Sequence, residues 1–142
     1  MHVTLIDQPA RRIAGLAVRT SFTAVPVDAG TIWQRVIAEG LLAAGRPLFG
    51  VYTAYESDYR GAYTMLVGVE TDDTPPGHEA VRLPAGRYAR LAADGDPAVA
   101  VARTWQYVHG EWPDRERRAY VADFEIHGVR GPGTADVYVG IR

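Results

Sequence analysis

An internal repeat with a constant offset constrains the fold of this chain more than any other feature. Three short motifs of the first half return in the second half after 71 or 72 residues. A duplicated unit keeps one offset from end to end, so the repeat predicts a chain built twice from the same unit. The matching pairs are Ala14-Gly15 with Ala85-Gly86, Trp33-Gln34 with Trp105-Gln106, and Val67-Gly68-Val69 with Val139-Gly140-Ile141.

Each unit follows the order strand, helix, strand, strand. Thr31 and Gln34 form a capping-box pattern that predicts the start of the first helix, with Gly45 near its end, and Asp96-Pro97 predicts the start of the second, which runs to about Glu111. Alternating and β-rich runs predict strands at 12–22, 48–56 and 62–70 in the first unit and at 79–92, broken near Pro84, 119–127 and 135–141 in the second.

These patterns predict one α+β domain over residues 1–142 with pseudo-twofold symmetry. Its first repeat covers about 11–70, a Pro-rich linker covers 71–77, and the second repeat covers about 78–142. Residues 2–6 are expected to form at most an edge strand. We expect a curved antiparallel sheet with both helices on one face and a ligand cleft on the other.

Composition excludes several classes of function. The formal charge of −2 gives no positive field for nucleic acid or an anionic membrane, and no long apolar run or leader is apparent. The absence of cysteine and of a leader favours a cytoplasmic protein without thiolate chemistry, and all 15 basic residues are arginine, so a Schiff-base lysine is excluded. The four histidines lack metal-ligand spacing, and Ser21 and Ser57 lack a His-acid context. We therefore expect no metal and no cofactor.

One carboxylate, Glu125, stands in the strand predicted at 119–127, where side chains alternate between the two faces of the sheet. We expect the apolar set that includes Phe124 to face the helices, so that Glu125 faces the cleft. Trp105 and its repeat partner Trp33 are expected in the core. The same alternation places Tyr138, Tyr52 and Leu66 on the cleft side with Glu125. Trp112 at the end of the second helix and Tyr88 after the Pro84 break are added to them. The predicted ligand-binding set is therefore Glu125, Tyr138, Tyr52, Trp112, Tyr88 and Leu66. A carboxylate among aromatic rings favours cationic or polar aromatic ligands.

Several motifs of the second half resemble the GyrI-like small-molecule-binding family, the effector-binding domain of AraC- and MerR-type multidrug regulators and of SbmC-like proteins. They are Leu83-Pro84-Ala85-Gly86-Arg87-Tyr88-Ala89, Trp105-Gln106-Tyr107-Val108, Trp112-Pro113, Asp123-Phe124-Glu125-Ile126-His127 and Asp136-Val137-Tyr138-Val139. The resemblance implies a bacterial protein with two strand-helix-strand-strand repeats around a central pocket, in which Glu125 is the acid that meets cationic ligands. His127 stands where the family often has Tyr, which implies a more polar pocket edge.

Three functions follow from these observations. The first is a stand-alone binding protein for a xenobiotic or effector, because residues 1–11 are too few for a helix-turn-helix. The resemblance also implies a hydrolase of reactive small molecules, in which Glu125 acts on water and Tyr52 or Tyr138 donates a proton. A third possibility, also implied by the family, is an inhibitor of gyrase type with a protein partner.

Overall fold

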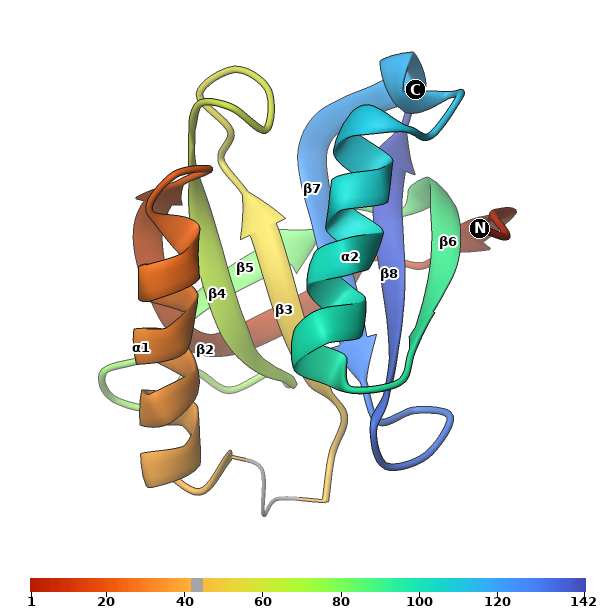
Figure 1. Cartoon of the computed structure of the whole chain (residues 1–142). Coiled ribbons are helices and arrows are strands. Elements are labelled where there is room, and N and C mark those ends of the chain that lie inside the picture. Colours follow the sequence, from red (N-terminus) through yellow and green to blue (C-terminus); the bar gives the residue numbers. More distant parts are fainter. Residues whose placement is uncertain (42–44) are drawn as a thin grey trace.

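A computed structural model of the chain describes all residues except 42–44, so the last part of the helix expected up to Gly45 lies outside the described residues. Its strands alternate with two long helices in the predicted order, twice over (Figure 1). The strands are β1 (Thr4–Gln8), β2 (Arg11–Ser21), β3 (Leu48–Thr53), β4 (Ala62–Glu70), β5 (Glu79–Leu83), β6 (Gly86–Asp94), β7 (Arg118–His127) and β8 (Thr134–Ile141); the helices are α1 (Val25–Ala38), α2 (Pro97–Gly110) and the short 3-10 helix η2 (Arg115–Arg117).

All eight strands join one antiparallel sheet in the order β1-β6-β8-β7-β3-β4-β2-β5. The trio β6-β8-β7 of the second unit mirrors the trio β2-β4-β3 of the first, and the two trios meet where β7 pairs with β3. We call this junction the seam. It brings β3 and β7, the edge strands of the two half-sheets, side by side between the helices in Figure 1. The predicted α+β fold with repeated units is confirmed.

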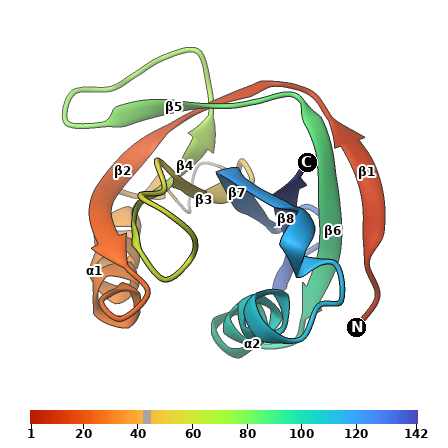
Figure 2. The same cartoon turned by 90° about the horizontal axis from the view of Figure 1, so that it is seen from above.

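The sheet has different coverings on its two faces. Both helices pack on one face, while β5, the bent strands β2 and β6, and β1 arch over the other (Figure 2). Separate apolar clusters lie under α1 and under α2, centred on Val36 and Val108. A third cluster, which includes Phe124 and Leu83, fills the space between the central strands and the arch.

The helix starts follow different local rules. α2 begins as predicted, because the Asp96 carboxylate accepts a hydrogen bond from the backbone N–H of Ala98, at 3.1 Å. The predicted start of α1 is wrong: the helix begins at Val25, six residues before Thr31, with Pro26 in its first turn. Thr31 instead donates its hydroxyl to the carbonyl of Val27 within the helix, at 3.2 Å. Proline fits the first turn of a helix, where its missing N–H has no partner to lose.

Glycine is required where β2 crosses β4. Gly15 pairs directly with Gly68, and a Cβ added to Gly68 would stand 1.9 Å from the carbonyl oxygen of Ala14. A side chain at either position would therefore collide with the opposite backbone. This close approach gives a physical reason for two of the glycines in the sequence repeat, Gly15 and Gly68.

The predicted facing of β7 is wrong. Phe124 lies opposite Tyr138 of β8 and packs under the arch, whereas Glu125 lies opposite Val137 and faces the helices. The alternation itself holds, because Ala122, Phe124 and Ile126 share one face as predicted. That face meets the cluster under the arch and not the helices, and both faces of β7 are buried, so apolar character alone does not tell which layer a face meets.

Candidate functional site

Glu125 lies on β7, where the two half-sheets meet, and is buried on the helix-covered face with an exposed fraction of only 2 %. Its Oε2 accepts hydrogen bonds from the Trp105 indole N–H at 2.8 Å and the Tyr52 hydroxyl at 3.2 Å. Its Oε1 lies 3.1 Å from Nε2 of His127. The carboxylate is therefore held by three side chains, from β3, α2 and β7, of which none carries a fixed positive charge.

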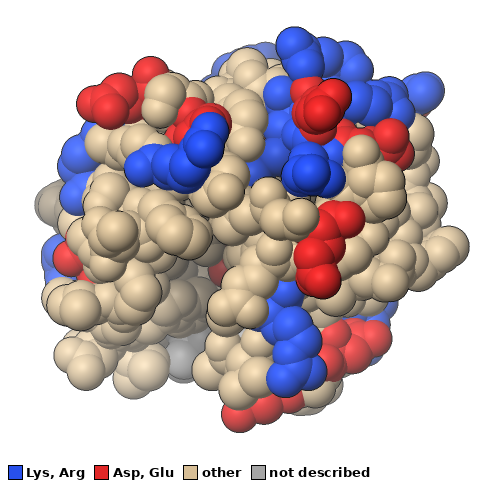
Figure 3. All heavy atoms as spheres, turned by 45° about the horizontal axis from the view of Figure 1, so that its top comes forward, with Lys and Arg blue, Asp and Glu red and all other residues tan. Residues whose placement is uncertain are grey.

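Rings from both helices surround this carboxylate. Trp33 of α1 meets the His127 ring edge-on at 5.3 Å, and Tyr52 meets Trp105 of α2 edge-on at 5.3 Å. All four rings are only half-buried. Figure 3 shows the surface hollowed between the lobes that carry the two helices. We call this region, with Glu125 at its base and Trp33, Tyr52, Trp105 and His127 around it, the helix groove.

Glycine at position 50 makes room for the carboxylate. Gly50 lies directly opposite Glu125 on β3, and a Cβ added there would approach Oε1 to 2.8 Å. Contacts below 3 Å between such atoms are repulsive, so any larger residue would displace the carboxylate from its donors. The absence of a side chain at Gly50 thus sets the position of Glu125.

A second carboxylate on the same face has a different environment. Asp123 is fully buried and pairs with Arg118, whose Nη2 donates to Oδ2 at 2.9 Å. The Tyr55 hydroxyl also donates to Oδ2, at 2.5 Å, and the backbone N–H of Gly140 donates to Oδ1, at 2.8 Å. The negative charge of Asp123 is therefore neutralised inside the protein, unlike that of Glu125.

Two tyrosines keep their protons beside these acids. Burial, followed by the charge of Glu125, raises the pKa of Tyr52 well above its ordinary value. Burial, followed by the charge of Asp123, does the same to the pKa of Tyr55. Both hydroxyls therefore act as hydrogen-bond donors to a carboxylate at any physiological pH.

His109 continues the row of rings along α2. It stacks on Tyr59 at 4.1 Å with an angle of 7° between the rings, and it lies 5.8 Å from Trp105. Nη1 of Arg118 donates to its Nδ1 at 2.9 Å, which fixes the neutral imidazole with its proton on Nε2. Burial, together with the charge of Arg118, lowers the pKa of His109 to about 4. Tyr59, His109 and Arg118 also line an open pocket of about 600 Å³ near the C-terminal end of α2.

Stability is expected to fall on acidification because of His109. Its pKa is about 4 when folded and 6.5 in the reference state, so below pH 6.5 the unfolded chain takes up a proton that the folded chain refuses until about pH 4. Between pH 6.5 and pH 4 the free energy of unfolding is expected to fall by on the order of 1–2 kcal/mol, a figure reduced for solvent screening at the exposed edge of the ring. Urea unfolding from pH 7.5 to pH 4 measures it, and His109→Asn, which keeps an acceptor near Nδ1, should have a shallower decline. An equal slope in both proteins would contradict this account.

The six residues predicted to bind ligand do not lie together. Glu125 and Tyr52 meet in the helix groove, whereas Tyr138, Leu66 and Tyr88 belong to the cluster under the arch, across the sheet. Trp112 is 2 % exposed and packs in the cluster under α2. Tyr138 therefore cannot donate a proton in a reaction on Glu125, and in the hydrolytic alternative only Tyr52 remains beside that carboxylate.

Sequence reasoning missed two tryptophans and an arginine. Trp105, assigned to the core, donates to Glu125, and Trp33 covers His127. Their shared place in the repeat was the available signal, because pseudo-symmetric helices on either side of a seam present matching residues to it. Arg118 had no such signal, since it reaches Asp123 only through the irregular start of β7.

In the part of the chain that the structure describes, no three His, Cys, Asp or Glu side chains gather as a metal site. None of the described helices has the length and apolar character needed to cross a membrane.

Comparison with known proteins identifies relatives of the fold. Residues 1–140 match the family described as GyrI-like small molecule binding domain. An integron cassette protein from the mobile metagenome of Vibrio cholerae superposes with a TM-score of 0.80 at 21 % identity, covering 99 % of this chain and 95 % of that one. SAV2435 bound to tetraphenylphosphonium gives 0.80 at 17 % identity, covering 100 % and 94 %. A putative transcription regulation protein from Staphylococcus aureus gives 0.79 at 14 % identity, covering 100 % and 99 %. No curated protein matches the chain in sequence.

Proposed function

This chain belongs to the GyrI-like family of small-molecule-binding domains, and from that premise we propose that it binds a small organic cation with aromatic rings in the helix groove. Glu125 is the anionic anchor for the positive charge. Trp33, Tyr52 and Trp105 supply ring faces and edges that pack against the rings of the ligand.

The observation that carries this proposal is a buried carboxylate without a cation. Among the described residues, Glu125 has no arginine partner, and its three contacts are a phenol, an indole and an imidazole. Asp123, two residues away on the same face, has Arg118 at 2.9 Å. A buried charge is costly unless an opposite charge compensates it, so a cation that enters the groove gains an ion pair that no described arginine provides.

A relative supports the charge of the ligand. SAV2435 binds tetraphenylphosphonium, a monocation with four phenyl rings. With Asp123 already paired with Arg118, the helix groove offers one carboxylate, Glu125, that no described arginine pairs with. We therefore expect ligands with a single positive charge to bind more tightly than dications of the same size.

Two isosteric ions test the proposal directly. Tetraphenylphosphonium and tetraphenylborate have nearly the same shape and opposite charges, so their difference isolates electrostatics from ring packing. We expect the cation to quench tryptophan fluorescence with at least about tenfold higher affinity than the anion, equivalent to about 1.4 kcal/mol. A Trp105→Phe variant shows whether the quenched ring is the one beside Glu125. Equal affinities for the two ions would remove the ion pair from the proposed function.

A further inference from the structure

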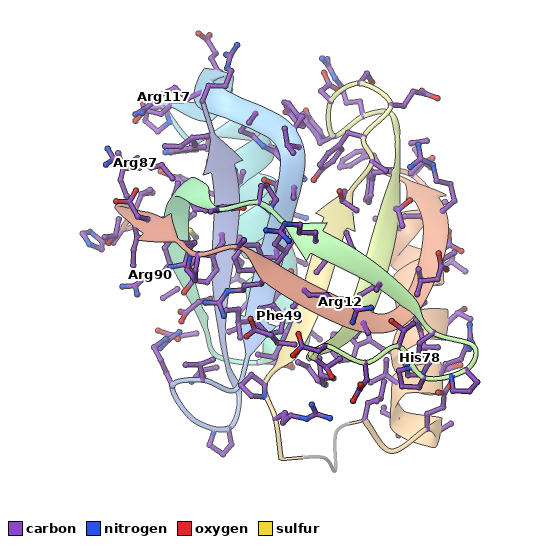
Figure 4. The ribbon with its side chains drawn as sticks, turned by 180° about the vertical axis from the view of Figure 1, so that it is seen from behind. Arg12, Phe49, His78, Arg87, Arg90 and Arg117 are labelled. Atoms are coloured by element: carbon purple, nitrogen blue, oxygen red, sulfur yellow. The ribbon has the colours of Figure 1, made fainter. Side chains whose placement is uncertain are left out.

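A second pocket opens on the face of the sheet opposite the helices. Its volume is about 420 Å³, within the range of about 300–1,000 Å³ typical of small-molecule sites. It lies between the β1–β2 turn, the start of β3 and the ends of β7 and β4, beneath the arch. We call it the arch pocket and define it by Arg11, Arg46, Phe49, Glu70, Ile126 and Tyr138. Figure 4 views this face and labels Phe49 beside β2.

The sheet separates the arch pocket from the helix groove. Ile126 lines the arch pocket, while its neighbour Glu125 faces the helices and contacts Trp105. Successive residues of a strand point to opposite faces, so a ligand in one site cannot touch the other. The two sites share a strand without sharing a surface.

The floor of the arch pocket is apolar and aromatic. Phe49 and Ile126 are buried beside it, and Tyr138 stacks on Phe124 beneath at 4.7 Å with an angle of 10°. Val129 at the rim is 58 % exposed, which adds apolar surface that a ligand can cover. A flat ring system matches a floor of this kind.

The charged groups of the arch pocket are two arginines and one glutamate. Arg11 lies over the Phe49 ring at 5.6 Å and pairs with Glu70 at 3.0 Å, but its Nε is buried without a partner. Arg46 has no ion pair or side-chain hydrogen bond among the described residues. The two guanidinium groups face one carboxylate, that of Glu70, so the charge of the pocket is positive, opposite to that of the helix groove.

The hydroxyl of Tyr138 points to the same conclusion. Tyr138 is 7 % exposed, and its hydroxyl forms no hydrogen bond with any described residue. Among the described side chains, the polar atoms that are both closed to solvent and without a hydrogen-bond partner are Nε of Arg11 and Nε of Arg118. The Tyr138 hydroxyl is not among them. The hydroxyl is therefore open to the pocket, where a ligand oxygen would satisfy it.

From these observations we propose that the arch pocket binds a small aromatic carboxylate, independently of the cation in the helix groove. The ring lies on Phe49, Ile126 and Tyr138. The carboxylate accepts hydrogen bonds from the Arg46 guanidinium, whose planar fork matches two oxygens, and from the Tyr138 hydroxyl. This site extends the protein from a binder of cations to one with two sites of opposite charge preference.

Calorimetric titration with 2-naphthoate tests the site, with 2-naphthylmethylamine as the probe of inverted charge. We expect 2-naphthoate to bind, and we expect the amine, a cation suited to the helix groove, not to compete with it. Arg46→Gln should weaken 2-naphthoate at least about tenfold and Tyr138→Phe roughly three- to tenfold. Arg82→Gln, which removes an exposed arginine of β5 outside the pocket, is the matched control and should leave binding unchanged.

Three results would overturn the proposal: no 2-naphthoate binding at millimolar concentration, equal affinities in Arg46→Gln and Arg82→Gln, or competitive displacement of 2-naphthoate by tetraphenylphosphonium. Arg46 is exposed, so Arg46→Gln is expected to remain folded and to bind tetraphenylphosphonium as the unchanged protein does. Binding of 2-naphthoate without binding of tetraphenylphosphonium would refute the proposed function and leave this site standing.

Discussion

Replacing Glu125 by glutamine is expected to weaken tetraphenylphosphonium binding roughly 30- to 1,000-fold, the equivalent of about 2–4 kcal/mol. Glutamine has nearly the shape of glutamate and still offers one oxygen to the Trp105 indole, 2.8 Å from Oε2 in the structure. The substitution therefore removes the charge and keeps the volume. Because no arginine among the described residues pairs with Glu125, we expect the loss to appear in ligand affinity rather than in folding.

Glu79→Gln is the matched control for this substitution. Glu79 is exposed at the start of the edge strand β5 and is not part of the helix groove, so the same chemical change there should leave the affinity unchanged. Thermal unfolding of both variants without ligand shows whether each remains folded. If Glu125→Gln bound the cation as tightly as Glu79→Gln, the rings alone would account for binding and Glu125 would have no part in it.

The fold could be predicted because its signals are local or repetitive. Asp96-Pro97 predicts the start of α2 because the Asp96 side chain accepts a hydrogen bond from the backbone N–H of Ala98, two residues along the chain. β4 spans residues 62–70, as predicted. The constant offset then relates each element to its partner. The pairing of β3 with β7 at the centre of the sheet follows from such a duplication, because each unit leaves the corresponding strand at its edge.

The facing of the site could not be predicted because both faces of β7 are buried, with Phe124 on one and Glu125 on the other. Tyr120 has a positive φ of 53°, and the pairing of β7 with β8 shifts between Arg118 and Asp123, but from Ala122 to Ile126 the side chains alternate as predicted. The apolar set on β7 packs under the arch and not under the helices. Sequence reasoning placed Glu125 with Tyr138, whereas the register pairs Tyr138 with Phe124 and separates the two candidate pockets by the thickness of the sheet. Alternation predicts which residues share a face of a strand but not which layer covers that face.

Breaking the buried ion pair is expected to have the largest effect on stability. Asp123→Asn leaves the guanidinium of Arg118, whose side chain is 1 % exposed, without its counter-ion, and should lower the free energy of unfolding by about 3–5 kcal/mol. Urea unfolding measures the loss. Asp58→Asn, which makes the same change in the surface pair of half-buried Asp58 with exposed Arg60, is the matched control and should change stability little.

The same substitution should also affect the helix groove. In Asp123→Asn the unpaired Arg118 lies 5.9 Å from the Trp105 ring, where its charge opposes a ligand cation. We expect the folded variant to bind tetraphenylphosphonium several-fold more weakly. Adding Arg118→Met removes the stranded charge, so the double variant should regain both affinity and part of the lost stability, as buried pairs replaced by apolar residues often do. If the double variant were as unstable and as weak in binding as Asp123→Asn alone, the account of Arg118 as the neutralising partner of Asp123 would be wrong.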